Sequence, residues 1–424
     1  MTEKIKIRGR QVLDGVVQIS GAKNAALPLL AASLLSPETL QLTNVPPLVD
    51  VQTMLALLGE MGVKFRVQPT SDYAMSIELQ ADAVECFIAP YDIVKKMRAS
   101  ILVLGPLLSR FGECCVSLPG GCAIGVRPVD LHLRGMEALG VNISLKDGYI
   151  SAKAPRGLRG ADFNFPSATV TGTENMIMAA VLASGTTVLR NAAKEPEIED
   201  LANCLNQMGA DISGHGSSTI EIRGVTGLRA AKHDVLPDRI EAGTYALAAG
   251  ITNGAVDLIG GDFRRLLPTF LDKITEAGLW VSDVDGGIRV ESSGKISAIQ
   301  VETQPFPGYP TDLQAQMMAM LCMADGESDI CETIWENRFL HVAELTRMGA
   351  DIGVSGAHAH IRGVRHLLGA PVFATDLRAS FSLVLAALAA DGESILDRVY
   401  HLDRGYCAVK KKLAGCGVTV ERFR

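Results

Sequence analysis

Six glycines recur along the chain at intervals of about 70 residues. Each ends an amphipathic segment and precedes an alternating, strand-like stretch, as in LNQMGA at 205–210. A helix commonly ends in a left-handed residue, a conformation that glycine adopts without steric cost. The glycines are Gly62, Gly140, Gly209, Gly278, Gly349 and Gly417, which lie 78, 69, 69, 71 and 68 residues apart. This spacing predicts one structural unit repeated six times.

A second signal has the same period and a different offset. Alanine-rich helical segments end at Pro37, Gly112, Gly185, Gly254, Gly326 and Gly392. Each leads into a short apolar strand, such as 186–189 or 255–258. Each unit thus combines strands with two helices, which is an α/β module. Any α/β protein of this size ends many helices in glycine, but two interleaved signals favour a true repeat. A chain of 424 residues favours two domains of three units over one closed ring.

Charge and hydropathy narrow the class of protein. With 40 Lys+Arg against 47 Asp+Glu, the net charge of −7 argues against a sequence-independent nucleic-acid binder. No apolar run reaches the roughly 18 residues that a membrane helix needs. The N-terminal segment 4–8 alternates like a strand and has no signal-peptide core, so we expect no membrane association and a cytoplasmic location.

The cysteines and histidines give no metal-binding pattern. Nine cysteines are scattered with no C-x-x-C pair, and the eight histidines include no H-E-x-x-H. His358 and His360 alternate as in a strand and are expected to be solvated rather than ligating. We therefore predict neither a bound metal nor a cofactor.

A glycine-rich loop at 117–130 is the most distinctive stretch. It offers G-x-x-x-x-G at 120–125, but Val126 and Arg127 stand where a phosphate-binding loop needs Lys and then Ser or Thr. What remains is the Cys122 thiol, five residues before Arg127. A nearby cation makes a thiol more reactive, although a structural cysteine in a surface turn fits these residues equally well.

Three other segments carry charges in places where chemistry is possible. Lys23 falls in the first turn of a helix, where a cation opposes the helix dipole unless an anion joins it; simple solvation is the alternative. Asp312 follows PGYPT at 307–311 and is either a first-turn carboxylate or a base presented at a cleft. The segments 375–380 and 401–406 pair Asp with Arg, for an internal ion pair or for gripping an anion.

Taken together, these segments resemble the enolpyruvyl transferases, most closely the branch whose acceptor is UDP-N-acetylglucosamine. The resemblance covers essentially the whole chain. Its motifs are GAKNA at 21–25, KMRAS at 96–100, GGC at 120–122, RPVDLH at 127–132, LPDR at 236–239, PTD at 310–312, ENRF at 336–339 and DRGY at 403–406.

The resemblance implies a two-domain, inside-out α/β barrel with three repeats in each domain and the active site in the interdomain cleft. One domain, 23–235, would carry the cysteine loop. The other, 1–22 plus 236–424, would carry the general base, and the linkers would lie near Gly21 and Pro237.

The implied reaction moves the enolpyruvyl group of phosphoenolpyruvate onto the 3′-hydroxyl of UDP-N-acetylglucosamine and releases phosphate by addition and elimination. It would be the first committed step of peptidoglycan precursor synthesis, serving cell-wall biogenesis, cell shape and cell division. The family implies no cofactor, and the antibiotic fosfomycin alkylates its cysteine.

The resemblance also implies roles for individual residues. Cys122 would be the acid that protonates carbon 3 of phosphoenolpyruvate, and it can add covalently to the enolpyruvyl carbon; Asp312 would be the general base, with Lys23 and Arg404 also catalytic. The implied phosphoenolpyruvate ligands are Lys23, Asn24, Arg127 and Arg404. The implied nucleotide-sugar ligands are Asn24, Arg98, Arg127, Pro128, Val129, Asp130, Leu131, Thr169, Val170, Asp312 and Ile334. Ser167 departs from the basic residue that some members carry near the diphosphate.

Two alternatives stay open at this point. The sister family of enolpyruvylshikimate-phosphate synthases shares fold and donor but lacks a catalytic cysteine on such a loop, so Cys122 argues against it. A six-repeat chain could also be a scaffold without catalysis, although the net charge of −7 does not suit a scaffold for nucleic acid.

Overall fold

The computed structural model describes residues 3–118 and 129–424, and it divides into two compact units. Of the described residues, unit 1 comprises the N-terminal segment up to Ser20 together with Pro237–Arg424, and unit 2 comprises 21–118 and 129–236. The chain therefore passes between the units twice, at Ser20–Gly21 and at Leu236–Pro237. The cysteine loop of the sequence prediction, including Cys122, lies outside the described residues.

Within the described residues the strands form six sheets of four strands, all with one topology. The third sheet of unit 2 is typical: β10 (Asp162–Asn164) pairs in parallel with β11 (Thr186–Arg190), which pairs antiparallel with β13 (Thr219–Arg223). The remaining strand, β12 (Asp211–Ser213), pairs antiparallel with β13 on its other side. The mixed α/β class and the repeated unit predicted from glycine spacing are confirmed.

Unit 2 holds three of these sheets around three inner helices. Its other sheets are, in spatial order, β14 (Ala231–Asp234), β3 (Thr39–Val45), β5 (Met75–Gln80) and β4 (Lys64–Pro69), and β6 (Ile88–Ala89), β7 (Glu113–Ser117), β9 (Tyr149–Lys153) and β8 (Asn142–Lys146). The inner helices are α1 (Lys23–Ala32), α4 (Leu104–Phe111) and α6 (Val170–Ala180); the others are α2 (Val49–Glu60), α3 (Tyr91–Val94), η2 (Arg98–Val103), α5 (Asp130–Ala138) and α7 (Pro196–Gln207).

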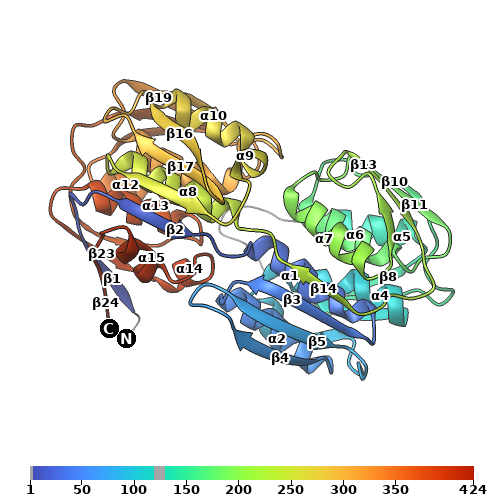
Figure 1. Cartoon of the computed structure of the whole chain (residues 1–424). Coiled ribbons are helices and arrows are strands. Elements are labelled where there is room, and N and C mark those ends of the chain that lie inside the picture. The colour runs from blue at the N-terminus through green and yellow to red at the C-terminus, as the bar shows by residue number, and fades with distance from the viewer. Residues whose placement is uncertain (1–2, 119–128) are drawn as a thin grey trace. The chain divides into compact units, whose positions relative to one another are not determined.

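Unit 1 repeats this plan (Figure 1). Its sheets are β22 (Pro371–Phe373), β23 (Glu393–Asp397), β1 (Lys4–Arg8) and β24 (Val420–Phe423); β16 (Leu279–Val284), β17 (Gly287–Ser292), β15 (Ala255–Ile259) and β2 (Asp14–Gln18); and β18 (Gln300–Glu302), β19 (Glu327–Cys331), β21 (His358–Arg362) and β20 (Asp351–Ser355). The inner helices are α8 (Arg239–Ile251), α11 (Gln314–Leu321) and α13 (Ala379–Ala389); α9 (Phe263–Leu266), α10 (Pro268–Glu276), η3 (Thr311–Leu313), α12 (Val342–Arg347), α14 (Tyr400–Asp403) and α15 (Val409–Gly415) complete the unit.

The inner helices are buried along most of their length. Every residue of α8 is buried, and small side chains let it approach its neighbours: Gly243 lies directly against the side chain of Leu313. The Asp238 carboxylate caps α8 by accepting from the backbone N–H groups of Ile240 (2.8 Å) and Glu241 (3.1 Å). Since each fully buried Leu or Phe contributes about 1.5–3 kcal/mol, these helices form the core that holds each unit together.

The N-terminal segment belongs to unit 1, where both of its strands pair. Strand β1 completes the sheet of β23 and β24, and β2 pairs in parallel with β15 before the chain enters α1; Figure 1 shows blue β2 within the yellow part of the chain. At the crossings, the Asp238 N–H donates to the Ser20 carbonyl (2.8 Å) inside unit 1, and the Ala22 N–H donates to the Leu236 carbonyl (2.7 Å) inside unit 2. The N-terminal strand predicted from alternation is confirmed.

The six periodic glycines all have left-handed φ angles, between 77° and 101°. Of the offset set, Gly112, Gly185, Gly326 and Gly392 also have positive φ. Gly254 serves a different purpose, because an added Cβ would lie 1.9 Å from the Leu13 carbonyl oxygen. In the described parts of the chain, no helix is both long enough and apolar enough to cross a membrane.

We predict that Gly140→Ala lowers the free energy of unfolding by about 1–2 kcal/mol, because the left-handed conformation is strained for any residue with a Cβ. Gly140 has a φ of 93° and no atom within 4 Å of an added Cβ, so the loss isolates backbone strain. Gly227→Ala is the control, since that site is equally open and has no left-handed φ. Urea unfolding of both variants checks this, and an unchanged Gly140→Ala protein would contradict it.

Candidate active site

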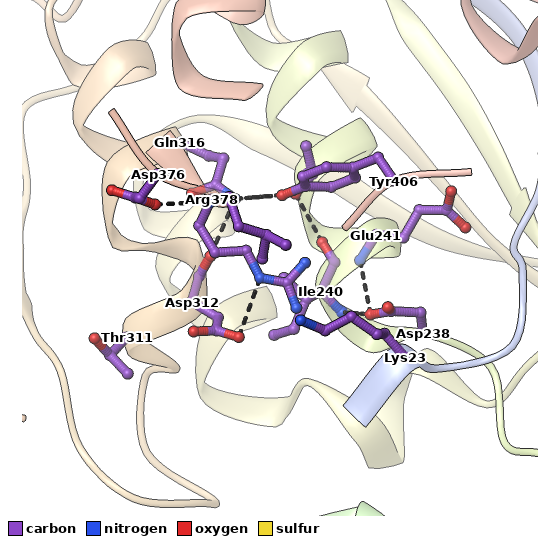
Figure 2. Close-up of polar contacts among 12 residues, drawn as sticks. Lys23, Asp238, Ile240, Glu241, Thr311, Asp312, Gln316, Asp376, Arg378 and Tyr406 are labelled. Carbon is purple, nitrogen blue, oxygen red and sulfur yellow. Dashed lines mark hydrogen bonds and ion pairs between the residues drawn. The ribbon is translucent and has the colours of Figure 1, made fainter. Parts of the chain in front are cut away.

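Asp312 lies in η3, at the start of the inner helix α11, and its carboxylate is held by two arginines. Oδ1 accepts from Arg338 Nη2 at 2.7 Å, and Oδ2 accepts from Arg378 Nε at 3.1 Å, the latter drawn in Figure 2. The Asp312 side chain is 26% exposed, whereas those of Arg338 and Arg378 are only 5% and 3% exposed. Such charged hydrogen bonds favour the ionised carboxylate and fix its orientation while one edge still meets solvent.

Arg378 directly precedes α13 and is buried among groups that stabilise its charge. Burial is the largest effect and opposes the charge, but the Asp312 carboxylate, Tyr406 and Asp238 together outweigh it and raise the pKa of the guanidinium above its ordinary value. Its Cζ lies 5.5 Å from the centre of the Tyr406 ring. Among the described residues, Arg378 Nη1 is buried and has no hydrogen-bond partner. A buried cation with a spare donor is suited to an anionic ligand.

The same network fixes the segment that carries Arg404. Gln316 Nε2 donates to the Asp312 carbonyl (3.0 Å) and to Tyr406 Oη (2.8 Å), so α11 and the segment after α14 are joined. Arg404 ends α14 two residues before Tyr406 and is half-buried. Burial and the nearby charge of Arg404 lower the pKa of His401. Arg404 therefore belongs to the same region of unit 1 as Asp312.

Ile334 lies in the loop that follows β19. Its backbone N–H donates to Glu332 Oε1 at 2.9 Å, and the same loop supplies Arg338. The structure thus brings Asp312, Arg404 and Ile334 together in unit 1, as parts of one connected set of loops.

In unit 2, Lys23 begins α1 but is not the solvated lysine that was the simpler expectation. Its side chain is buried, and Nζ lies 3.3 Å from Asp50 Oδ2, in the first turn of α2. The alternative of a solvated lysine is therefore wrong, because the side chain is buried against Asp50. Asn24 follows in the same turn and is half-buried.

A second group in unit 2 surrounds the N-terminus of α5, with Val129 as its N-cap and Asp130 and Leu131 in its first turn. The ring of His132 approaches Asn175 Nδ2 (3.0 Å) through Nδ1 and Thr171 Oγ1 (3.3 Å) through Nε2. Burial first, and the charge of Arg98 second, lower the pKa of His132 to about 4. Arg98, at the start of η2, is therefore placed near His132.

The third group in unit 2 begins α6. Thr169 is the N-cap, and its Oγ1 accepts from the Gly172 N–H at 3.3 Å; Val170 is the first helical residue. Ser167 is exposed just before this cap. Thr171 joins this helix start to His132, so the two groups are one cluster. Cys122, Arg127 and Pro128 lie outside the described residues, and their roles stay predictions.

Sequence reasoning did not assign Arg338 or Arg378 to the site, although it singled out the segments that contain them. The segment with Asp376 and Arg378 does not form the simple internal ion pair that was one alternative. Asp376 Oδ1 accepts from the backbone N–H of Arg378 (2.8 Å), which leaves the guanidinium for Asp312. Asp403 pairs with Arg422. Only the folded chain shows that two arginines distant in sequence share one carboxylate.

No group of three His, Cys, Asp or Glu side chains suited to a metal ion occurs in residues 3–118 and 129–424. His358 and His360, expected to be solvated, are more than half exposed, but both also contact Asp329, at 2.9 and 2.6 Å.

Comparison with known proteins assigns the family. The model of the family described as EPSP synthase (3-phosphoshikimate 1-carboxyvinyltransferase) matches residues 7–413. The chain belongs to this family of enolpyruvyl transferases. It is 57% identical over 422 residues to the UDP-N-acetylglucosamine 1-carboxyvinyltransferase of Acidiphilium cryptum, covering 100% of both chains. It is 56% identical over 423 residues to the enzyme of that name from Dinoroseobacter shibae, covering 100% of this chain and 99% of the relative.

Solved structures of enolpyruvyl transferases share the fold. The enolpyruvyl transferase NikO from Streptomyces tendae superposes with a TM-score of 0.88 at 24% identity, covering 99% of each chain. An EPSP synthase from Acinetobacter baumannii superposes with a TM-score of 0.74 at 17% identity, covering 100% of each chain. The predicted inside-out α/β barrel is thereby confirmed.

We predict that the His132 ring does not titrate between pH 7 and pH 5. Its pKa of about 4 lies well below the ordinary value of 6.5, so the folded protein keeps the ring neutral throughout this range. Histidine-labelled protein followed by NMR checks this. A His132 midpoint near pH 6.5 would contradict it.

Proposed function

We propose that this enolpyruvyl transferase moves the enolpyruvyl group of phosphoenolpyruvate onto the 3′-hydroxyl of UDP-N-acetylglucosamine and releases phosphate. The observation that carries the proposal is an ionised carboxylate, Asp312, held between two buried guanidiniums in a chain 52–57% identical over its whole length to UDP-N-acetylglucosamine 1-carboxyvinyltransferases. A proton acceptor and anion-binding groups are what this reaction requires.

In the proposed mechanism, Asp312 takes the proton of the sugar hydroxyl. Two guanidiniums make it a weak base, but a weak base suffices because the hydroxyl becomes acidic as its oxygen bonds to the electron-poor carbon 2. The contacts to Arg338 and Arg378 point the carboxylate in one direction, so little reorganisation is needed at the moment of transfer.

The cationic groups bind the phosphate and carboxylate of the donor. Arg378 Nη1 is a buried donor with no partner in the described part of the chain, and we assign it to an anionic oxygen of phosphoenolpyruvate. Arg404 and, from unit 2, Lys23, Asn24 and Arg127 would complete the donor site. Preorganised positive groups stabilise the charge that moves onto the departing phosphate.

Cys122 would supply the proton to carbon 3 of phosphoenolpyruvate. That step makes carbon 2 cationic; the sugar oxygen then adds to carbon 2. In the elimination, carbon 3 loses a proton and the carbon–oxygen bond to phosphate breaks, which restores the double bond. A thiol near Arg127 could both hold and release a proton near neutral pH.

The nucleotide sugar would be bound by residues from both units. In unit 2 these are Asn24, Arg98, Arg127, the segment 128–131, Thr169 and Val170; in unit 1 they are Asp312 and Ile334. This division requires the active site to lie between the predicted domains, 23–235 and 1–22 plus 236–424. We place the reaction in the cytoplasm, at the first committed step of peptidoglycan precursor synthesis, where fosfomycin would inhibit it.

The acceptor substrate distinguishes this proposal from its nearest rival, an enolpyruvylshikimate-phosphate synthase. We predict phosphate release from phosphoenolpyruvate with UDP-N-acetylglucosamine and none with shikimate 3-phosphate, because the relatives at 52–57% identity carry the first substrate in their name. A phosphate-release assay with each acceptor checks this. Release with shikimate 3-phosphate alone would contradict the proposal, and release with neither would favour a scaffold without catalysis.

A further inference from the structure

Glu332 is a buried carboxylate directly after β19 that no part of the proposed mechanism uses. It is 4% exposed, and four neutral donors surround it. Oε1 accepts from Thr303 Oγ1 (3.0 Å) and from the backbone N–H groups of Ile334 (2.9 Å) and Trp335 (3.2 Å). Oε2 accepts from Thr311 Oγ1 at 2.8 Å. Burying a carboxylate is costly, and complete hydrogen bonding at both oxygens offsets that cost.

The two oxygens hold different parts of the site. Oε1 fixes the main chain at Ile334, in the loop proposed to contact the nucleotide sugar. Oε2 fixes the hydroxyl of Thr311, the residue before Asp312. A single rigid carboxylate thus spans the acceptor loop and the element that carries the base.

The contact with Thr311 continues to the base itself. Thr311 Oγ1 gives its proton to Glu332, so its lone pairs face Arg338, whose Nη1 donates to it at 2.8 Å. The other end of the same guanidinium, Nη2, donates to Asp312 Oδ1 at 2.7 Å. The direction of each hydrogen bond in this chain is set by Glu332, because a carboxylate can only accept.

We propose that Glu332 is a positioning residue that couples the acceptor-sugar loop to the general base: it orients Asp312 through Thr311 and Arg338, and it holds the Ile334 loop through its other oxygen. This inference rests on the proposed function for the roles of Asp312 and Ile334. Glu332 itself touches neither substrate in this account.

The first test is Glu332→Gln, which has nearly the same shape. Its amide oxygen can still accept from the three Oε1 donors, but its NH₂ group replaces Oε2 and cannot accept from Thr311. The Thr311 hydroxyl then loses its acceptor, and the new NH₂ group competes with Arg338 as a donor to the lone pairs of Thr311 Oγ1. We expect kcat to fall about 10- to 100-fold, with the KM for UDP-N-acetylglucosamine nearly unchanged. Glu332→Ala removes both carboxylate oxygens, so it frees the Ile334 loop as well as Thr311. In this variant we expect the KM for UDP-N-acetylglucosamine to rise in addition to the fall in kcat.

Thr311 supplies a second, independent pair of variants. Thr311→Val removes the hydroxyl and should lower kcat by a similar factor, while Thr311→Ser keeps it and should restore most of the turnover. Because Glu332→Gln and Thr311→Val break the same hydrogen bond, their effects on kcat should be far from additive in the double variant.

Thr252→Val is the matched control for Thr311→Val. Thr252 is buried in unit 1, donates to the Ala248 carbonyl (2.7 Å) and accepts from the Leu13 N–H (3.2 Å). The Val variant therefore loses two comparable hydrogen bonds at a position away from the site. Thermal unfolding accompanies the kinetics of every variant, and the Thr311 variants decide the matter if Glu332→Gln does not fold.

Equal kcat values for Thr311→Val and Thr252→Val, or failure of Thr311→Ser to restore turnover, would overturn the proposal. Wild-type protein that releases no phosphate with UDP-N-acetylglucosamine would instead refute the proposed function, so the two failures are distinguishable.

Discussion

The unit 1 site depends on the hydrogen bonds through which Arg338 and Arg378 share the carboxylate of Asp312. Two guanidiniums that are almost fully buried would each be costly alone, and the carboxylate between them compensates both. In return, the arginines hold the carboxylate in one orientation at the edge of solvent. Removing Asp312 would leave both buried guanidiniums without this carboxylate, so we expect the residue to matter for folding as well as for the proposed chemistry.

The repeated fold explains how these groups come to lie together. Asp312 lies two residues before the inner helix α11, Arg378 directly precedes α13, and Asp238 caps the third, α8. Inner helices of this kind pack side by side, so their N-terminal ends bring residues from three repeats into one region. Lys23 holds the corresponding place at the start of α1 in unit 2. The chemistry thus uses positions that the repeat itself generates.

Much of the architecture could be predicted from sequence because its signals are local. Gly140 and Gly209 mark helix ends through their own backbone conformation, and the period of such glycines shows the repeat. The PTD motif and the family resemblance single out Asp312, whose role as the base stays a prediction. The loop that carries Cys122 stays a sequence prediction.

Other features could not be predicted because they depend on contacts between distant segments. Lys23 looks like an exposed first-turn lysine until the burial of α1 and its contact with Asp50 are known. Arg378 stands two residues after Asp376, which invites a local ion pair, yet its side chain turns to a residue 66 positions away. Glu332 gives no sequence signal at all, because its four donors come from three separate parts of the loops around η3 and β19.

The steady-state kinetics of Asp312→Asn test most directly whether Asp312 is the base. The amide keeps the size of the side chain but is no longer a base, so we expect kcat to fall about 10²- to 10⁴-fold while the KM for UDP-N-acetylglucosamine stays nearly constant. Asp257→Asn is the matched control, because that carboxylate is also 26% exposed and also accepts from one arginine, at 2.8 Å, on β15. An Asp312→Asn enzyme that keeps its kcat and loses only affinity would contradict the role of Asp312 as the base.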